Sequence, residues 1–151
     1  MSHAIRRMAV IFTLFIGTGA VAFAGPTLMP NGDLRIPKKE VTAVAKFYPY
    51  TAGGVLMEVL ALRAPDGTVR TAFNTCQVCY SSGRGYYTQK GDYLVCNNCG
   101  NRFPASQVEL IKGGCNPVPI ARDEKKEDAD FITIPKAILD QAKPLFLRWK
   151  R

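Results

Sequence analysis

The chain has 151 residues and a formal net charge of +8, and this length suffices for one domain with its own core. Its basic residues are spread along the chain and do not alternate with aromatic residues. This spread argues against a nucleic-acid partner and indicates solubility, with affinity for an anionic membrane surface as an alternative. The single histidine, His3, lies near the N-terminus. The rest of the chain therefore excludes a histidine-containing zinc site, a haem attachment motif, a Ser-His-Asp triad and a Cys-His dyad.

The first 24 residues have the features of an export signal. Arg6 and Arg7 precede an uncharged apolar stretch, and Ala22-Phe23-Ala24 forms a small-x-small cleavage site before Gly25. The stretch has about 16 residues, fewer than the roughly 20 of a spanning helix, so cleavage is favoured over an uncleaved anchor. We predict a signal peptide over 1–24 and a single domain over 25–151. The protein is then exported and periplasmic, and is attached to the inner membrane only if the signal remains.

The first part of the domain is predicted to form an antiparallel meander. An extended leader over 25–37 is followed by three strand-like segments that turn residues separate, at 41–48, 55–62 and 68–73. The middle segment is almost continuously apolar, which predicts a strand buried on both faces. Pro65-Asp66-Gly67 predicts the turn after it. The third segment leads directly to Cys76.

Four cysteines form two Cys-x-x-Cys pairs, Cys76 with Cys79 and Cys96 with Cys99, separated by sixteen residues. The intervening segment predicts a hairpin with Gly91 in its turn, which brings the two pairs together. Two such pairs can close a tetrahedron of four sulfurs that suits zinc, a single iron or an iron–sulfur cluster. Because the protein is predicted to be exported, redox-active dithiols and structural disulfides are the alternatives.

Cys115 lies in a glycine-rich turn, Gly113-Gly114-Cys115-Asn116-Pro117. Such a turn would hold the thiol rigidly and let another group approach it closely. It is therefore a candidate fifth ligand, open-site ligand or reactive thiol, with a small buried hydrophobic residue as the alternative. We expect its sulfur to lie near the two Cys-x-x-Cys pairs.

The C-terminal part predicts four elements in order: a short strand over 107–111, a solvated charged loop over 122–130, a strand over 131–134, and a helix that begins at Pro135 and ends at Pro144. The basic end over 148–151 is expected to stay in solvent. The predicted fold class is mostly β: an antiparallel meander that carries a ribbon-like four-cysteine hairpin, with one short C-terminal helix.

These motifs together resemble the FtrD-like family of membrane iron–sulfur proteins. The resemblance covers roughly residues 28–147 and depends on the two cysteine pairs and on the Gly-Gly-Cys-Asn-Pro turn at 113–117. The family is associated with bacterial iron-uptake systems, in which a periplasmic iron-binding protein and a cupredoxin work with an iron permease. Two departures stand out: many members carry several transmembrane helices ahead of this domain, and many have Asp-Ala where this chain has Asn74-Thr75.

The resemblance implies that all five cysteines are the cofactor-binding residues: Cys76, Cys79, Cys96, Cys99 and Cys115. The first four are the predicted metal ligands. The predicted function is an exported iron–sulfur or iron-binding protein that assists iron uptake by electron transfer, with the iron permease and periplasmic iron-binding proteins as partners. Zinc is the alternative metal. A structural zinc-ribbon module and a thiol–disulfide oxidoreductase are the alternative functions, and no nucleophile–base pair indicates a hydrolase.

Overall fold

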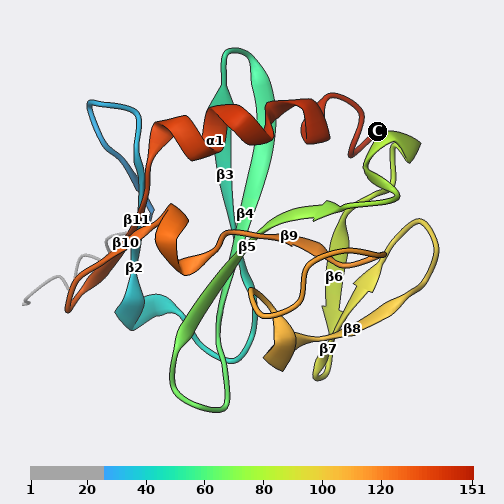
Figure 1. The fold of residues 1–151 in the computed structure, drawn as a ribbon, viewed down its shortest axis with the longest axis horizontal. Helices are drawn as coiled ribbons and strands as arrows, with labels where there is room; N and C mark the ends of the chain where they lie inside the picture. Colours follow the sequence, from blue (N-terminus) through green and yellow to red (C-terminus); the bar gives the residue numbers. More distant parts are fainter. Residues whose placement is uncertain (1–25) are drawn as a thin grey trace, which may run out of the picture.

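The computed structural model describes residues 26–151, so the predicted signal peptide lies outside the described residues. The strands form three antiparallel sheets (Figure 1). Sheet A has the order β1 (Thr27–Leu28), β2 (Leu34–Pro37), β11 (Phe131–Ile134), β10 (Lys126–Glu127). Sheet B has the order β3 (Lys46–Ala52), β4 (Val55–Arg63), β5 (Val69–Cys76), β9 (Pro117–Pro119). Sheet C has the order β6 (Tyr87–Lys90), β7 (Tyr93–Cys96), β8 (Arg102–Pro104).

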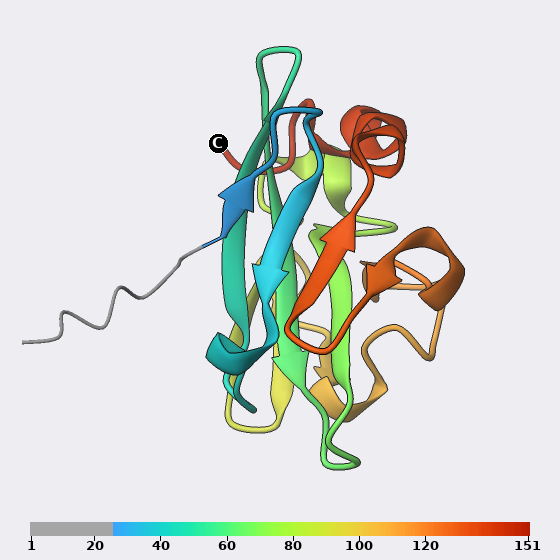
Figure 2. The same cartoon turned by 90° about the vertical axis from the view of Figure 1, so that its left-hand side faces the viewer.

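One α-helix, α1 (Lys136–Ala142), follows β11 and continues into a 3-10 helix, η5 (Lys143–Phe146). Four shorter 3-10 helices complete the described part: η1 (Lys38–Glu40), η2 (Tyr80–Ser82), η3 (Ala105–Gln107) and η4 (Arg122–Glu124). Figure 2 turns sheet A toward the viewer, with β2 and β11 side by side. The mostly β fold with one short C-terminal helix confirms the predicted fold class.

Strands β4 and β5 separate two hydrophobic cores. Because successive side chains of a strand point to opposite faces, Val59 and Ala61 enter the first core while Leu60 and Leu62 enter the second. The first core lies between sheet B, sheet A and α1, and the second lies between sheet B and sheet C. The apolar run predicted over 55–62 is thus buried on both faces only from residue 59 to residue 62, because Leu56 is exposed. The second core contains Cys76, Cys79 and Cys96, and Cys115 packs against it.

The predicted strand over 41–48 begins later than expected. β3 starts at Lys46, and the Thr42 hydroxyl accepts a hydrogen bond of 3.2 Å from the Val44 N–H. This local bond competes with strand pairing. The preceding segment instead runs beside the end of β4, where the Arg63 N–H donates to the Thr42 carbonyl.

The predicted strand over 107–111 is wrong. Glu109 has a φ of 70°, which lies in the left-handed region and is incompatible with a strand. Its carboxylate accepts the N–H of Thr71 at 3.0 Å and pairs with Lys125. Lys125 is buried and also donates to the Thr71 hydroxyl at 3.0 Å. The loop over 122–130 was expected to be solvated, and this residue is an exception. The ion pair joins positions too distant in sequence for their charge pattern to indicate it.

At the C-terminal end, the basic residues Arg148, Lys150 and Arg151 are exposed, as expected, but Trp149 packs against the domain. Trp149 is only 3 % exposed, and its ring meets those of Phe146 and Tyr86 edge-on at 5.1 and 6.0 Å. Its indole N–H donates to the Leu56 carbonyl at 3.0 Å. The Trp149 ring therefore closes one end of the first core.

Replacing Trp149 with alanine should lower the free energy of unfolding by about 3–4 kcal/mol, as expected for removing a buried aromatic ring. Leu147→Ala is the control, because Leu147 is exposed and a surface change should cost at most about 0.5 kcal/mol. Urea denaturation followed by circular dichroism measures both variants. Equal stabilities of the two variants would contradict the packing of this end.

Candidate metal centre

The five cysteines come from three segments that meet at one end of the second core. Cys76 ends β5 and Cys79 follows it, Cys96 ends β7 and Cys99 follows it, and Cys115 precedes β9. The pairing of β7 with β6 returns the second pair to the first, as the predicted hairpin requires. The pairing of β5 with β9, with a bulge before Cys76, brings Cys115 to the same place.

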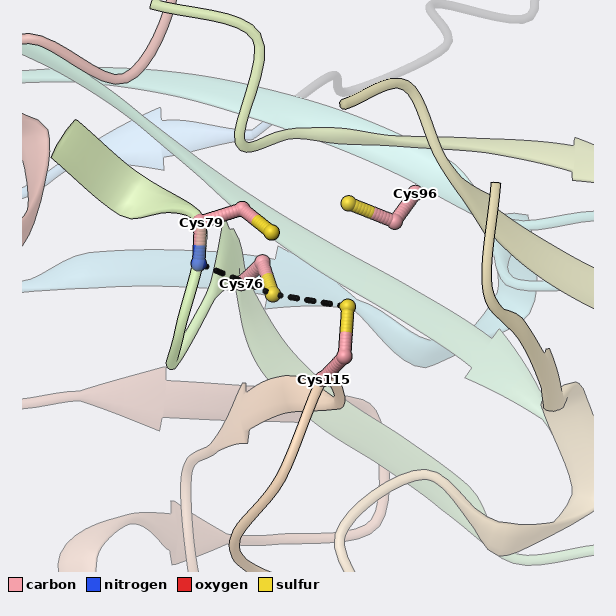
Figure 3. Close-up of side chains that lie close together, drawn as sticks. All are labelled: Cys76, Cys79, Cys96 and Cys115. Atoms are coloured by element: carbon pink, nitrogen blue, oxygen red, sulfur yellow. Dashed lines mark hydrogen bonds between the residues drawn. The ribbon is translucent and has the colours of Figure 1, made fainter. Parts of the chain in front are cut away.

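Four of the sulfurs form one compact group: those of Cys76, Cys79, Cys96 and Cys115 all lie within 4.8 Å of one another (Figure 3). The Cys76 and Cys115 sulfurs are 3.1 Å apart. This distance confirms that Cys115 lies near the pairs. The Cys99 sulfur is exposed and lies 2.9 Å from that of Cys115. The compact group therefore contains Cys115, whereas the sequence expectation had placed Cys99 among the four ligands.

Backbone N–H groups point to the first sulfur of each pair. The Cys79 N–H donates to the Cys76 sulfur at 3.3 Å, and the Val78 N–H also points to it. The second pair repeats this arrangement, with backbone N–H groups directed at Cys96. Gly100, with a φ of 74°, turns the chain after this pair. Such donors stabilise a thiolate over a thiol.

Side chains next to the cysteines tie the three segments together. The Asn97 N–H and side-chain amide both donate to the carbonyl of Tyr86 at 2.9 Å, which links the second pair to the residue just before β6. Gln77 accepts from the Gly113 N–H at 3.2 Å. Asn101 donates to the Cys115 carbonyl at 2.7 Å. The sequence expectations missed these amides. Their position beside or between cysteines was the available signal.

The sequence profile of the family described as "Membrane iron-sulfur containing protein FtrD-like" matches residues 41–146. The chain belongs to this family. No curated protein and no solved structure matches it. Over the part of the chain that the structure describes, no helix has the length and apolar character needed to cross a membrane. The family and the cysteine group support a metal-binding, iron-related role.

The thiols of this FtrD-like domain influence one another strongly. Burial raises the pKa of Cys79 to about 11 and also raises that of Cys96. Burial acts in the same direction on Cys76, but the nearby Tyr87 hydroxyl and hydrogen bonds from Cys115 and backbone N–H groups outweigh it and hold that pKa below its ordinary value. A hydrogen bond from Cys115, followed by one from the Asn101 N–H, lowers the pKa of Cys99 to about 7.

Cys115 has the opposite shift, because burial and its bonds to Cys99 and Cys76 raise its pKa. The pKa of Cys115 is thus raised, while those of its two neighbours, Cys76 and Cys99, are lowered. A cation that binds here displaces thiol protons and screens the charges of the thiolates, so metal binding and proton release are coupled.

The donor set fits a thiophilic metal ion. Tetrahedral ligands at a metal–sulfur distance of about 2.3 Å stand about 3.8 Å from one another, and the observed spread, from 3.1 Å to at most 4.8 Å within the compact group, includes this value. The Tyr87 hydroxyl supports the fit, since it is buried beside these sulfurs without a hydrogen-bond partner of full geometry. A buried donor of this kind suits an anionic metal–thiolate group.

Proposed function

We propose that this FtrD-like domain is an exported protein that holds iron through its cysteine sulfurs and transfers single electrons during iron uptake. The observation that carries the proposal is the group of four sulfurs within 4.8 Å of one another. Ligands of a single ion share one coordination sphere, whereas the ligands of a four-iron cluster bind different irons and stand further apart. The spacing therefore favours a single iron over a cluster.

Cys76, Cys79 and Cys96 are the ligands in every arrangement we consider, because all three are buried at the meeting point of the segments. Cys99 and Cys115 are the candidates for the fourth position, since their sulfurs are only 2.9 Å apart. Cys115 belongs to the compact group, and Cys99 faces solvent. We assign Cys115 as the fourth ligand and Cys99 as the sulfur that can replace it.

Bound iron would supply a one-electron couple between its ferrous and ferric states. The chain's own residues determine its surroundings. Apolar side chains of the second core, including Leu60, Leu94 and Phe103, exclude water from the inner side. The N–H groups at Cys76 and Cys96 stabilise the thiolates. The exposed Cys99 gives a partner close access to the site, and the resemblance implies that these partners are the iron permease and periplasmic iron-binding proteins.

Structural zinc is the second candidate. Four sulfurs at the end of a ribbon-like hairpin are also a typical structural zinc site. With zinc, the same thiolates would stabilise the fold without redox chemistry. A thiol–disulfide oxidoreductase is the third, because Cys-x-x-Cys pairs can cycle between dithiol and disulfide.

The test is the metal content of the full chain purified from the exported fraction of the cells that produced it. We expect one iron per chain, a visible absorption band that reduction bleaches, and no acid-labile sulfide. Detection of acid-labile sulfide would show that the site holds an iron–sulfur cluster and not a single iron. Zinc without colour would overturn the redox function, and a metal-free protein with a redox-active disulfide would favour the oxidoreductase. N-terminal sequencing of the same sample tests cleavage before Gly25.

A further inference from the structure

One buried hydroxyl near the cysteines has no ordinary role in the fold. Within residues 26–151, the buried side-chain oxygens without a hydrogen-bond partner are Glu40 Oε1, Tyr48 Oη and Tyr87 Oη. Leaving a buried polar group unpaired costs about 1–3 kcal/mol. Phenylalanine would fill the same space at position 87 without this cost. We therefore expect the Tyr87 hydroxyl to have a hydrogen-bond acceptor when the protein functions.

The position of Tyr87 directs its ring to the sulfurs. It lies on β6 directly opposite Cys96 on β7, and side chains of opposing residues share one face of the sheet. It is 2 % exposed and belongs to the core that contains Cys76, Cys79 and Cys96. Its hydroxyl lies next to the Cys76 sulfur, although it does not have the geometry of a full hydrogen bond in this structure.

The backbone of Tyr87 is fixed from the other side. Its N–H donates to the Asn74 side-chain oxygen at 2.8 Å. The amide group of Asn74 in turn donates to the Glu58 carboxylate at 2.8 Å. Since Asn74 is itself only 2 % exposed, this chain of bonds holds the start of β6 in place. These bonds therefore hold the backbone that carries the Tyr87 ring in its place beside the sulfurs.

We propose that Tyr87 is a positioning residue whose hydroxyl donates a hydrogen bond to the Cys76 thiolate when a metal ion is bound. A thiolate is a strong acceptor, and charge-assisted hydrogen bonds are about twice as strong as neutral ones. Donors of this kind around metal ligands tune affinity and reduction potential. The inference rests on the proposed metal site but not on the identity of the metal.

The structure offers a matched control in Tyr48. Its hydroxyl is also buried and unpartnered, and burial, followed by Glu40, raises its pKa to about 12. Tyr48 packs in the first core, away from the cysteines. Tyr48→Phe and Tyr87→Phe therefore remove the same buried group from the two cores, and only the second change removes it from the metal site.

The experiment compares both variants with the unchanged chain. Chelator competition measures cobalt(II) and zinc(II) affinity, and urea denaturation measures the stability of the metal-free protein. We expect both metal-free variants to be as stable as the unchanged chain or slightly more stable. We expect metal affinity to fall about tenfold in Tyr87→Phe only, the lower end of the effect of such supporting residues. In the iron-loaded protein, a tenfold change in the ratio of oxidised to reduced site corresponds to about 59 mV, and the midpoint potential should fall.

A second variant should change metal affinity in the opposite direction. Incorporation of 3-fluorotyrosine at position 87 keeps the ring and makes the hydroxyl a stronger donor, so metal affinity should rise. Unchanged affinity in both Tyr87 variants, or an equal loss in Tyr48→Phe, would overturn the proposal. Failure of the proposed iron function is a separate result, because it appears as absence of iron from the purified protein while cobalt affinity still reports on Tyr87.

Discussion

Serine in place of Cys76 should abolish metal binding, whereas serine in place of Cys99 or of Cys115 alone should leave most of it. The Cys76 sulfur is fully buried, accepts the Cys79 N–H and lies 3.1 Å from the Cys115 sulfur. Four cysteines remain without it, but Cys99 and Cys115 compete for one ligand position, so only three positions would stay filled. The sulfurs of Cys99 and Cys115 are 2.9 Å apart, so each can take the place of the other.

The loss in Cys76→Ser should be large, because metal binding to a structural cysteine site contributes about 10–16 kcal/mol of apparent free energy that is also folding energy. The variant should therefore unfold at the urea concentration of the metal-free protein. Metal per chain after desalting, together with urea denaturation, measures both effects.

The double variant Cys99→Ser/Cys115→Ser is the decisive comparison, since it should lose the metal that each single variant keeps. Full metal content in Cys76→Ser would contradict a single shared site. Complete loss of metal in Cys99→Ser alone would instead indicate that the ligands are the four cysteines of the two Cys-x-x-Cys pairs.

Alanine in place of Gly85 should unfold the cysteine end of the domain. A Cβ atom at this position would lie 2.2 Å from the Cys79 carbonyl oxygen, 2.5 Å from its carbon and 2.7 Å from the Tyr80 Cα. All three are backbone atoms, so no side-chain rotation relieves the clash. The Gly85 carbonyl also accepts the Cys76 N–H at 2.7 Å, and the clash would pull this bond apart.

We expect Gly85→Ala to cost more than about 4 kcal/mol, which is exceptional for a single substitution, and to lose its metal. The control is Gly91→Ala in the hairpin turn, where the φ is 58° and no atom lies within 4 Å of the added Cβ. The control should cost only about 1–2 kcal/mol, the strain of a left-handed residue, and should bind metal normally. Similar stability and metal content in the two variants would show that the close approach at Gly85 does not exist in solution.

Much of the fold could be predicted from the sequence, because the signals were local. The hairpin between the cysteine pairs follows from a short strand, a turn with Gly91 at positive φ, and a second strand. The apolar run of β4 predicted burial on both faces, and the structure places Leu60 and Ala61 in different cores. In each case the deciding residues lie within a few positions of one another.

The spacing of the pairs and the glycine-rich turn also predicted that five cysteines would meet, since hairpin closure and tight turns are properties of short segments. The arrangement of the sulfurs was decided only by tertiary structure. Cys115 joins the compact group because β9 pairs with β5 across a bulge next to Cys76, and the energy of that pairing depends on two distant segments. The burial of Trp149 and the pairing of Glu109 with Lys125 have the same cause. Composition identified the end over 148–151 as basic and polar, but a hydrophobic surface is available to Trp149 only after sheet B and η5 have come together.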